Sequence, residues 1–277
     1  MKFSIVTPSF RGISWLKLCV ASVRDQNVAY EHIIQDAGSD DGTQEWLATQ
    51  SDLLVYCERD QGMYDAINRG LKRSTGDILG FLNCDEQYLP GALVAVRDHF
   101  RAHPSAEIVF ANAVVVDEGG GFICYRKAIR PEKYHTWITS NLAILTCATF
   151  FRGGLIHHRG LFFDAGMHAV GDSEWIMRLI DKKISMSLLP RFTSIFTETG
   201  HNMGISEKGK REQKAFVQTA PVLVRACKGL VVWHHRIRRF LGGAYRQDPF
   251  QYSIFTRDSP GERKSFDVES PRYRWVR

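Results

Sequence analysis

Polar residues follow short apolar runs at four points in the first 90 residues. The four segments are TPSFRG at 7–12, DAGSDDGT at 36–43, ERDQGMYDAINRG at 58–70 and NCDEQ at 83–87. Carboxylates and amides gathered in this way can hold a nucleotide, a sugar and a divalent cation. Loops rich in Asp, Asn and Gly are common, so only the four segments together indicate a shared site.

The segment NCDEQ carries the pattern most typical of a metal site. Asn83 and Asp85 are spaced i, i+2 after a strand that ends at Phe81 and Leu82. Hard oxygen donors of this kind suit Mg²⁺ or Mn²⁺, which keep several waters and bridge to substrate phosphates. A cation held there would neutralise a departing diphosphate. We therefore predict a divalent-cation cofactor, Mn²⁺ or Mg²⁺, at this segment.

The other segments offer groups for a nucleotide. Asp36 ends an apolar strand, where a rigid carboxylate is a good acceptor for a ring N–H such as the uracil imide. Gly62 precedes a helix and lets the backbone approach a phosphate at the helix N-terminus. Asp65 and Asn68 lie three residues apart on that helix and point the same way. They either hold sugar hydroxyls or face solvent.

The elements that must position these residues alternate between strand and helix. The patterns predict strands at 3–7, 32–35, 53–57, 77–82 and 107–111, and helices at 13–27, 42–50, 63–74 and 93–102. Such alternation predicts βαβ units and a Rossmann-like, mostly parallel α/β sheet flanked by helices. Ligands bind beyond the carboxyl ends of strands in these sheets, which is where the four polar segments lie.

Length and composition are those of a globular protein. The chain has 277 residues, of which 44% are hydrophobic and 24% charged, and this excludes a disordered, collagen-like or small disulfide-rich protein. No run of about 18 uncharged apolar residues occurs, and the N-terminus MKFSIVTPSF reads as a strand, not a signal peptide. The six cysteines are scattered without metal-ligand spacing, so we expect a reduced cytoplasmic protein.

Charge divides the chain into two parts. Residues 206–277 carry 16 Lys and Arg against 7 Asp and Glu, a net of +9, whereas residues 1–205 carry 20 against 23, a net of −3. We therefore predict a catalytic domain at 1–205. A basic C-terminal region would follow at 206–277.

The basic region begins with helical periodicity. Residues 206–241 predict one or two helices with apolar residues beside Arg and Lys. This pattern fits either an anionic membrane surface or a helix that docks on the catalytic body or on a second subunit of a homodimer. Residues 245–277 show no periodicity and are expected to form an arm over another surface. The histidine pairs at 157–158 and 234–235 are expected on the surface.

In order and spacing, the segments SIVTPSF, DAGSDDGT, ERDQGMYDAINRGL and GDILGFLNCDEQYLPGAL resemble the large inverting glycosyltransferase family 2. Its members have the A-type (GT-A) nucleotide-diphospho-sugar fold, and the similarity is to bacterial enzymes of surface-polysaccharide synthesis. The resemblance covers about residues 1–205, and it implies a nucleotide-sugar-binding half at 1–110 and an acceptor half at 111–205. It implies transfer of a sugar, with inversion, from a nucleotide-diphosphate donor, expected to be UDP-linked, to a hydroxyl of a glycan or lipid-linked acceptor.

The resemblance also implies site residues. Thr7, Pro8, Asp36 and Asp60 would line the nucleoside pocket, Gly62, Asp65 and Asn68 would meet the ribose and diphosphate, and Asn83 and Asp85 would fall on the metal motif at the donor. Asn83 stands where the family often has Asp, which leaves one carboxylate fewer. Glu86 stands where many members have a second Asp, so it is a substitute ligand or an acceptor-side group.

The second half is expected to supply the general base. Residues 146–180 resemble the acceptor region of the family, and there Asp172 begins an amphipathic helix. A helix N-terminus lowers the pKa of a carboxyl group, whereas desolvation raises it. The resemblance makes Asp172 the expected base and leaves Glu174 as its rival or an acceptor-binding group. His201 is either a metal ligand, a diphosphate contact or uninvolved.

Two other classes of protein share parts of this pattern. A nucleotidyltransferase has similar sheet and metal chemistry, but it needs a Gly-rich basic loop after the first strand, where TPSFRG has only Arg11 and Gly12. A non-catalytic nucleic-acid binder would use the basic region. That region lacks a nucleic-acid-binding signature and the body is acidic, so no nucleic-acid partner is expected.

Overall fold

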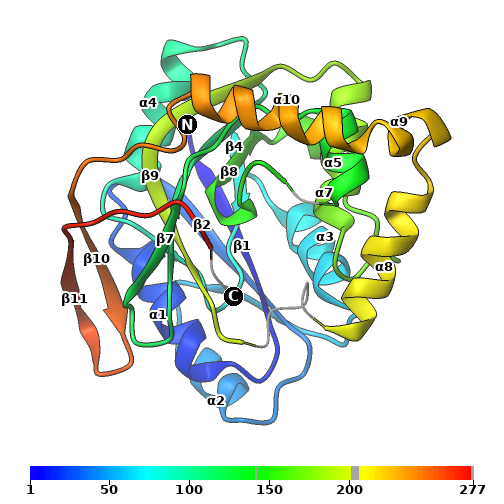
Figure 1. The fold of residues 1–277 in the computed structure, drawn as a ribbon. Coiled ribbons are helices and arrows are strands. Elements are labelled where there is room, and N and C mark those ends of the chain that lie inside the picture. The colour runs from blue at the N-terminus through cyan, green and yellow to red at the C-terminus, as the bar shows by residue number, and fades with distance from the viewer. Residues whose placement is uncertain (141, 201–205, 276–277) are drawn as a thin grey trace.

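The computed structural model describes residues 1–140, 142–200 and 206–275, and Figure 1 shows its fold. A nine-stranded sheet has the order β3-β2-β1-β4-β8-β6-β9-β5, with β7 paired to β6. The strands of the first half, all parallel, are β1 (Phe3–Ser9), β2 (Tyr30–Asp36), β3 (Leu54–Cys57) and β4 (Ile78–Phe81). The predicted α/β fold, with strands and helices alternating along the chain, is therefore confirmed.

The second half of the sheet mixes directions. Its strands are β5 (Gln87–Tyr88), β6 (Ile108–Val116), β7 (Phe122–Arg126), β8 (Thr149–Arg152) and β9 (Met186–Thr197). β8 runs antiparallel to both β4 and β6, while β6 and β9 are parallel. Since β8 pairs with both β4 and β6, the sheet is continuous from the predicted nucleotide half at 1–110 to the predicted acceptor half at 111–205.

Helices cover both faces of the sheet (Figure 1). They are α1 (Ile13–Arg24), α2 (Thr43–Ala48), α3 (Met63–Arg73), α4 (Ala92–Ala102), α5 (Lys133–Thr139), α6 (Gly154–His157) and α7 (Gly171–Asp181), with a 3₁₀ turn at Thr146–Ala148. α3 and α7 share one buried cluster with the strands, which includes Ile67 and Trp175. α1 and α4 share another on the opposite face, which includes Val23 and Phe100.

The basic C-terminal region is attached to the body. It contains α8 (Glu207–Gln218), α9 (Val222–Ala226) and α10 (Lys228–Leu241). The Glu212 carboxylate on α8 accepts the backbone N–H groups of His168 and Ala169 at 3.0 and 3.1 Å. On α10, the ring of His235 stacks on that of His135 in α5, with centroids 3.5 Å apart. The expectation that the pair 234–235 lies on the surface is therefore wrong for His235, which is buried.

The expected arm at 245–277 is a hairpin that folds on the same chain. β10 (Phe250–Thr256) and β11 (Ser259–Val268) pair antiparallel, and Tyr252, Ile254 and Val268 pack on β6 and β9. The alternation of Phe250, Tyr252 and Ile254 is the strand signal that the sequence reading missed. No helix of the described residues is long and apolar enough to cross a membrane.

Candidate active site

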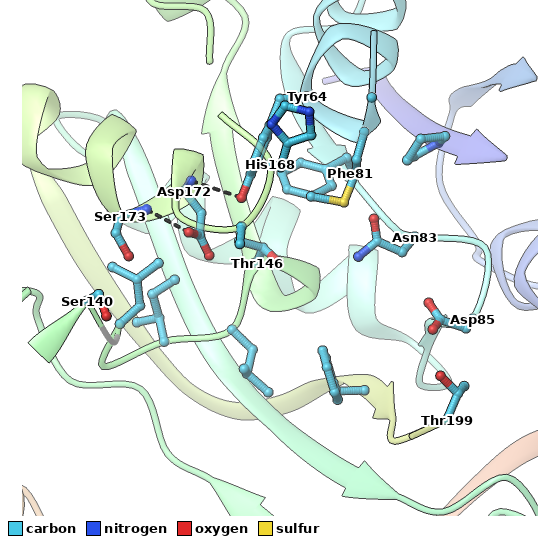
Figure 2. Close-up of a pocket in the computed structure, with 18 of the residues that line it drawn as sticks. Tyr64, Phe81, Asn83, Asp85, Ser140, Thr146, His168, Asp172, Ser173 and Thr199 are labelled. Carbon is cyan, nitrogen blue, oxygen red and sulfur yellow. Dashed lines mark hydrogen bonds between the residues drawn. The ribbon is translucent and has the colours of Figure 1, made fainter. Parts of the chain in front are cut away.

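One large cavity lies at the carboxyl ends of β1, β2 and β4 (Figure 2). It measures about 1730 Å³, more than the roughly 300–1,000 Å³ typical of a site for one small ligand. All four polar segments reach it, through Pro8 to Arg11, Ala37 with Gly38 and Asp40, Arg59 to Tyr64, and Asn83 to Asp85. The convergence predicted from the strand ends is therefore present in the fold.

Two predicted nucleoside residues lie beneath the cavity instead of lining it. The buried Asp36 carboxylate accepts the backbone N–H groups of Gly38 and Ser39 at 3.0 and 2.8 Å and the Ser39 hydroxyl at 2.7 Å. It thereby shapes the loop whose backbone lines the cavity. Thr7 is buried as well, and its hydroxyl bonds to His32 at 2.9 Å. Pro8 and Asp60 do line the cavity.

The start of α3 is shaped by its own carboxylates. Gly62 has φ +132°, which favours glycine, and donates its N–H to Asp60 at 2.9 Å. Asp65 accepts the Gln61 N–H at 3.0 Å and pairs with Arg69 at 2.8 Å. Gly62 lines the cavity, while Asp65 lies behind it.

Asn68 links α3 to the acceptor half. Its amide group donates to the Phe163 carbonyl at 2.8 Å and accepts the Phe163 N–H at 2.9 Å. Both hydrogen-bonding ends of the side chain are therefore used within the protein. Asn68 holds the acceptor half against the nucleotide half, away from the cavity wall.

The predicted metal segment presents oxygen atoms to the cavity. Asn83 and Asp85 line it, and the buried amide oxygen of Asn83 has no hydrogen-bond partner among the described residues. Burial raises the pKa of Asp85, so its anion lacks compensation in the protein alone. Glu86 is buried below and accepts the Asn83 N–H at 2.8 Å; burial, then Asp85, raise its pKa. An unpartnered oxygen beside a desolvated carboxylate fits a hard cation.

Asp172 stands across the cavity at the start of α7 (Figure 2). Burial raises its pKa to about 6, although hydrogen bonds from the backbone of Ser173 and from the Tyr64 hydroxyl oppose the rise. Its own N–H donates to the Tyr64 hydroxyl at 3.1 Å, and its carboxylate accepts the Ser173 N–H at 2.7 Å. A carboxylate with this pKa, held at the wall of a cavity, can take up a proton near neutral pH.

Gly171 is what allows Tyr64 to reach Asp172. A Cβ at Gly171 would come within 2.7 Å of the Tyr64 ring. That ring also stacks on Phe163, with centroids 5.5 Å apart, so it has no room to retreat. Neither residue was singled out from the sequence, because a close approach between distant segments leaves no local pattern.

Of the two remaining predicted residues, Glu174 does not line the cavity. Glu174 lies one turn into α7, and its carboxylate accepts from Arg178 at 2.5 Å. His201 lies outside the described residues. Thr199, just before it, does line the cavity and is labelled in Figure 2 on the side of Asn83 and Asp85.

The sequence also left part of the cavity wall unassigned. The C-terminal region contributes Val232, His235, Arg236, Arg239, Tyr245, Tyr273, Arg274 and Trp275. Its basic charge was visible from the sequence. Nothing in a helical period, however, says which surface a terminal helix will cover.

The family model described as Glycosyl transferase family 2 matches residues 4–157. A similar relative is a PGL/p-HBAD biosynthesis glycosyltransferase of Mycobacterium bovis, 29% identical over 120 residues. The match covers 41% of this chain and 47% of that protein, so the chain matches about half the relative's length.

Solved structures share the fold. TarS of S. aureus in complex with UDP-GlcNAc gives a TM-score of 0.61 at 16% identity, covering 87% of this chain and 73% of that one. The mannosyltransferase PcManGT from Pyrobaculum calidifontis, in complex with GDP-Man and Mn²⁺, gives 0.54 at 16% identity, covering 86% and 71%. With the family model matching more than half of its length, the chain belongs to glycosyl transferase family 2, and it has the GT-A fold.

Proposed function

We propose that this glycosyltransferase moves a sugar, with inversion, from a UDP-sugar to a hydroxyl of a lipid-linked or surface-polysaccharide acceptor. The observation that carries the proposal is one cavity with Asn83 and Asp85 on one side and Asp172, with its raised pKa, on the other. Donor complexes of the two structural neighbours, with UDP-GlcNAc and GDP-Man, support a nucleotide-sugar donor.

The proposed reaction is a single displacement. Asp172 accepts the proton of the acceptor hydroxyl as that oxygen forms a bond to the anomeric carbon. The bond from the anomeric carbon to the diphosphate breaks on the opposite face, and the nucleoside diphosphate leaves with the electron pair. Ser173 and Tyr64 orient the base through the bonds described above.

Asn83 and Asp85 would hold the divalent cation. Among residues 1–140, 142–200 and 206–275, no group of three His, Cys, Asp or Glu is arranged to hold a metal ion. Donor phosphates and water would supply most of the remaining ligands, as is usual for Mg²⁺ and Mn²⁺, and His201, outside the described residues, stays a further proposed ligand. Such an ion supplies charge neutralisation at the leaving diphosphate. The Mn²⁺ complex of PcManGT supports this assignment.

The donor nucleotide would occupy the strand ends. Pro8, Gly38 and Asp60 line that part of the cavity, and Asp36 and Thr7 support it from below. Gly62 brings the backbone of the α3 N-terminus to the diphosphate side. In this assignment Asp65 and Asn68 position α3.

The C-terminal region, proposed to extend from residue 206, would also meet an anionic membrane surface. Leu230, Trp233, Ile237, Phe240 and Leu241, the apolar stripe, lie on one face of α10 at helical spacing. All but Ile237 are 63–77% exposed. Two cations accompany the apolar stripe. The exposed Arg236 flanks it, and Lys228 is the first residue of α10. Apolar residues bordered by cations suit an anionic lipid interface.

A thermal-shift screen of nucleotide sugars, with and without Mn²⁺, tests the donor assignment. A selective donor should raise Tm by mass action, more so with Mn²⁺. The variant Asp85→Asn should lose the Mn²⁺-dependent part of the rise in Tm. The control Asp98→Asn, which changes an exposed side chain of α4, should keep it. Stabilisation by no nucleotide sugar would contradict the proposal. Release of pyrophosphate from a sugar phosphate and UTP would indicate a nucleotidyltransferase instead.

A further inference from the structure

Three arginines of the C-terminal region line the cavity and form what we call the basic wall: Arg236 and Arg239 on α10, and Arg274 near the C-terminus. Both supporting segments are anchored. α10 stacks His235 on His135 of α5, and the Tyr125 N–H of β7 donates to the Arg272 carbonyl at 2.9 Å. The basic wall is therefore a built part of the fold, and Figure 1 shows α10 crossing the molecule beside α5.

In residues 1–140, 142–200 and 206–275, no carboxylate pairs with the basic wall. Within the described part of the chain, none of its three arginines forms an ion pair. Arg238, on the same helix, pairs with Glu132 at 3.0 Å, and Arg263 pairs with Asp25 at 2.5 Å. Guanidinium groups gathered at one cavity without carboxylates repel each other, and a bound anion relieves that repulsion.

The carboxylates of the cavity belong to other segments. Its acidic lining residues in the described chain are Asp40, Asp60, Asp85 and Asp172. The first three follow strands of the nucleotide half, and Asp172 begins α7, against which α5 packs. Arg11 and Arg59 line the cavity beside these carboxylates, and Arg11 pairs with Asp40. The basic wall differs in that it comes from the C-terminal region, while the proposed base lies on the helix next to α5.

Neighbouring rings hold the basic wall in place. The guanidinium of Arg239 lies 5.0 Å from the centroid of the Tyr245 ring, which contacts that of Tyr273 at 4.7 Å. Burial, and then nearby arginines, lower the pKa of His135 to about 4. Burial, then His135 and then nearby arginines, lower the pKa of His235 to about 3. Both histidines are neutral at pH 7, so the positive charge there belongs to the arginines, which stay charged at all relevant pH.

We propose that the basic wall binds a phosphate or diphosphate group of the acceptor substrate. A planar guanidinium group can donate two parallel hydrogen bonds to phosphate oxygens. The three arginines together carry more positive charge than one carboxylate could neutralise, which suits a phosphate or diphosphate. In the proposed function, Asn83, Asp85 and Gly62 already serve the donor diphosphate, so the basic wall is left for the acceptor. All three arginines of the basic wall lie beyond residue 157, where the match to the family model ends. This inference rests on the proposed function, because an acceptor is defined only by the transfer.

Binding measurements on the full chain test the inference. Calorimetry would measure geranyl diphosphate and inorganic pyrophosphate against protein saturated with UDP and Mn²⁺, which occupies the donor side. The variant Arg236→Gln/Arg239→Gln should lose at least about tenfold in affinity for both probes while its UDP affinity stays within about twofold. The matched control is Arg211→Gln/Arg246→Gln, which removes two exposed arginines of the same region away from the cavity.

The outcomes separate this inference from the proposed function. Failure of the wild-type protein to bind UDP would refute the proposed function. Normal UDP binding with diphosphate affinity unchanged in the variant, or absent in the wild type, would overturn only the acceptor site. If the variant lost as much affinity for UDP as for the diphosphate probes, the arginines would belong to the donor site. That result would also overturn the acceptor site. Tighter binding of geranyl diphosphate than of pyrophosphate would indicate a lipid-linked source, and equal binding a phosphate group alone.

Discussion

Replacing Asp172 with Asn should lower activity and raise stability together. Burial raises the pKa of this carboxyl from 3.8 to about 6, and the difference corresponds to about 3 kcal/mol. Because the folded pKa is the higher one, the native state holds the extra proton between about pH 4 and 6. The free energy of unfolding therefore falls as pH rises through this window, and the ionised group costs up to about 3 kcal/mol at pH 7.

Asp172→Asn removes both the cost and the base. We expect turnover to fall about 10²-fold or more, and urea unfolding at pH 7 to show a gain of up to about 3 kcal/mol that vanishes by about pH 4. UDP release from the sugar nucleotide found in the thermal-shift screen reports turnover. In the wild-type protein, kcat/KM should fall about tenfold per pH unit below pH 6.

Asp181→Asn is the matched control, since it makes the same change at the other end of α7. Asp181 is exposed and pairs with Lys133 at 2.6 Å, so its loss should change activity little and stability by no more than about 1 kcal/mol. Turnover of Asp172→Asn within threefold of wild type would remove Asp172 from the role of base. An unchanged pH profile would do the same.

Three further changes test other parts of the structure. Asp85→Asn should abolish the Mn²⁺-dependent part of UDP binding in calorimetry, and undiminished binding would show that the ion is held elsewhere. Gly171→Ala should lower the free energy of unfolding, measured in urea, by about 1–3 kcal/mol, because the added Cβ meets the Tyr64 ring. Gly229→Ala, whose Cβ meets nothing, should be neutral or stabilising. Equal effects of the two changes would contradict the close approach of Gly171 and Tyr64. Leu230→Glu/Trp233→Glu should lose sedimentation with anionic liposomes, and loss of dimer mass instead would identify the stripe as a subunit interface.

Much of the nucleotide half could be predicted because its patterns are local. A buried strand such as β1 is a continuous apolar run, and α3 repeats its apolar residues at helical spacing. Parallel strands place their carboxyl ends at one edge, so the convergence of Asp60, Gly62 and Asp85 follows from strand order alone. The family resemblance, which depends on ordered motifs, was visible for the same reason.

The task of each polar side chain was not predictable in this way. Asp36 ends a strand and Asp85 follows one. The Asp36 carboxylate accepts hydrogen bonds from its own loop, whereas Asp85 lines the cavity. The difference depends on the turn that follows each strand and on what packs above it. Asn68 and Phe163 are 95 residues apart, and their mutual hydrogen bonds leave no trace in spacing.

The amino-acid sequence by itself determined the alternating strands and helices, the polar strand ends and the division between an acidic body and a basic C-terminal region. Only the tertiary structure decided that α10 and the C-terminal segment line the same cavity, and that burial, opposed by hydrogen bonds from Ser173 and Tyr64, sets the pKa of Asp172. The physical reason is that local patterns depend on residues within a few turns. Burial and electrostatic potential depend on whichever distant segments pack together.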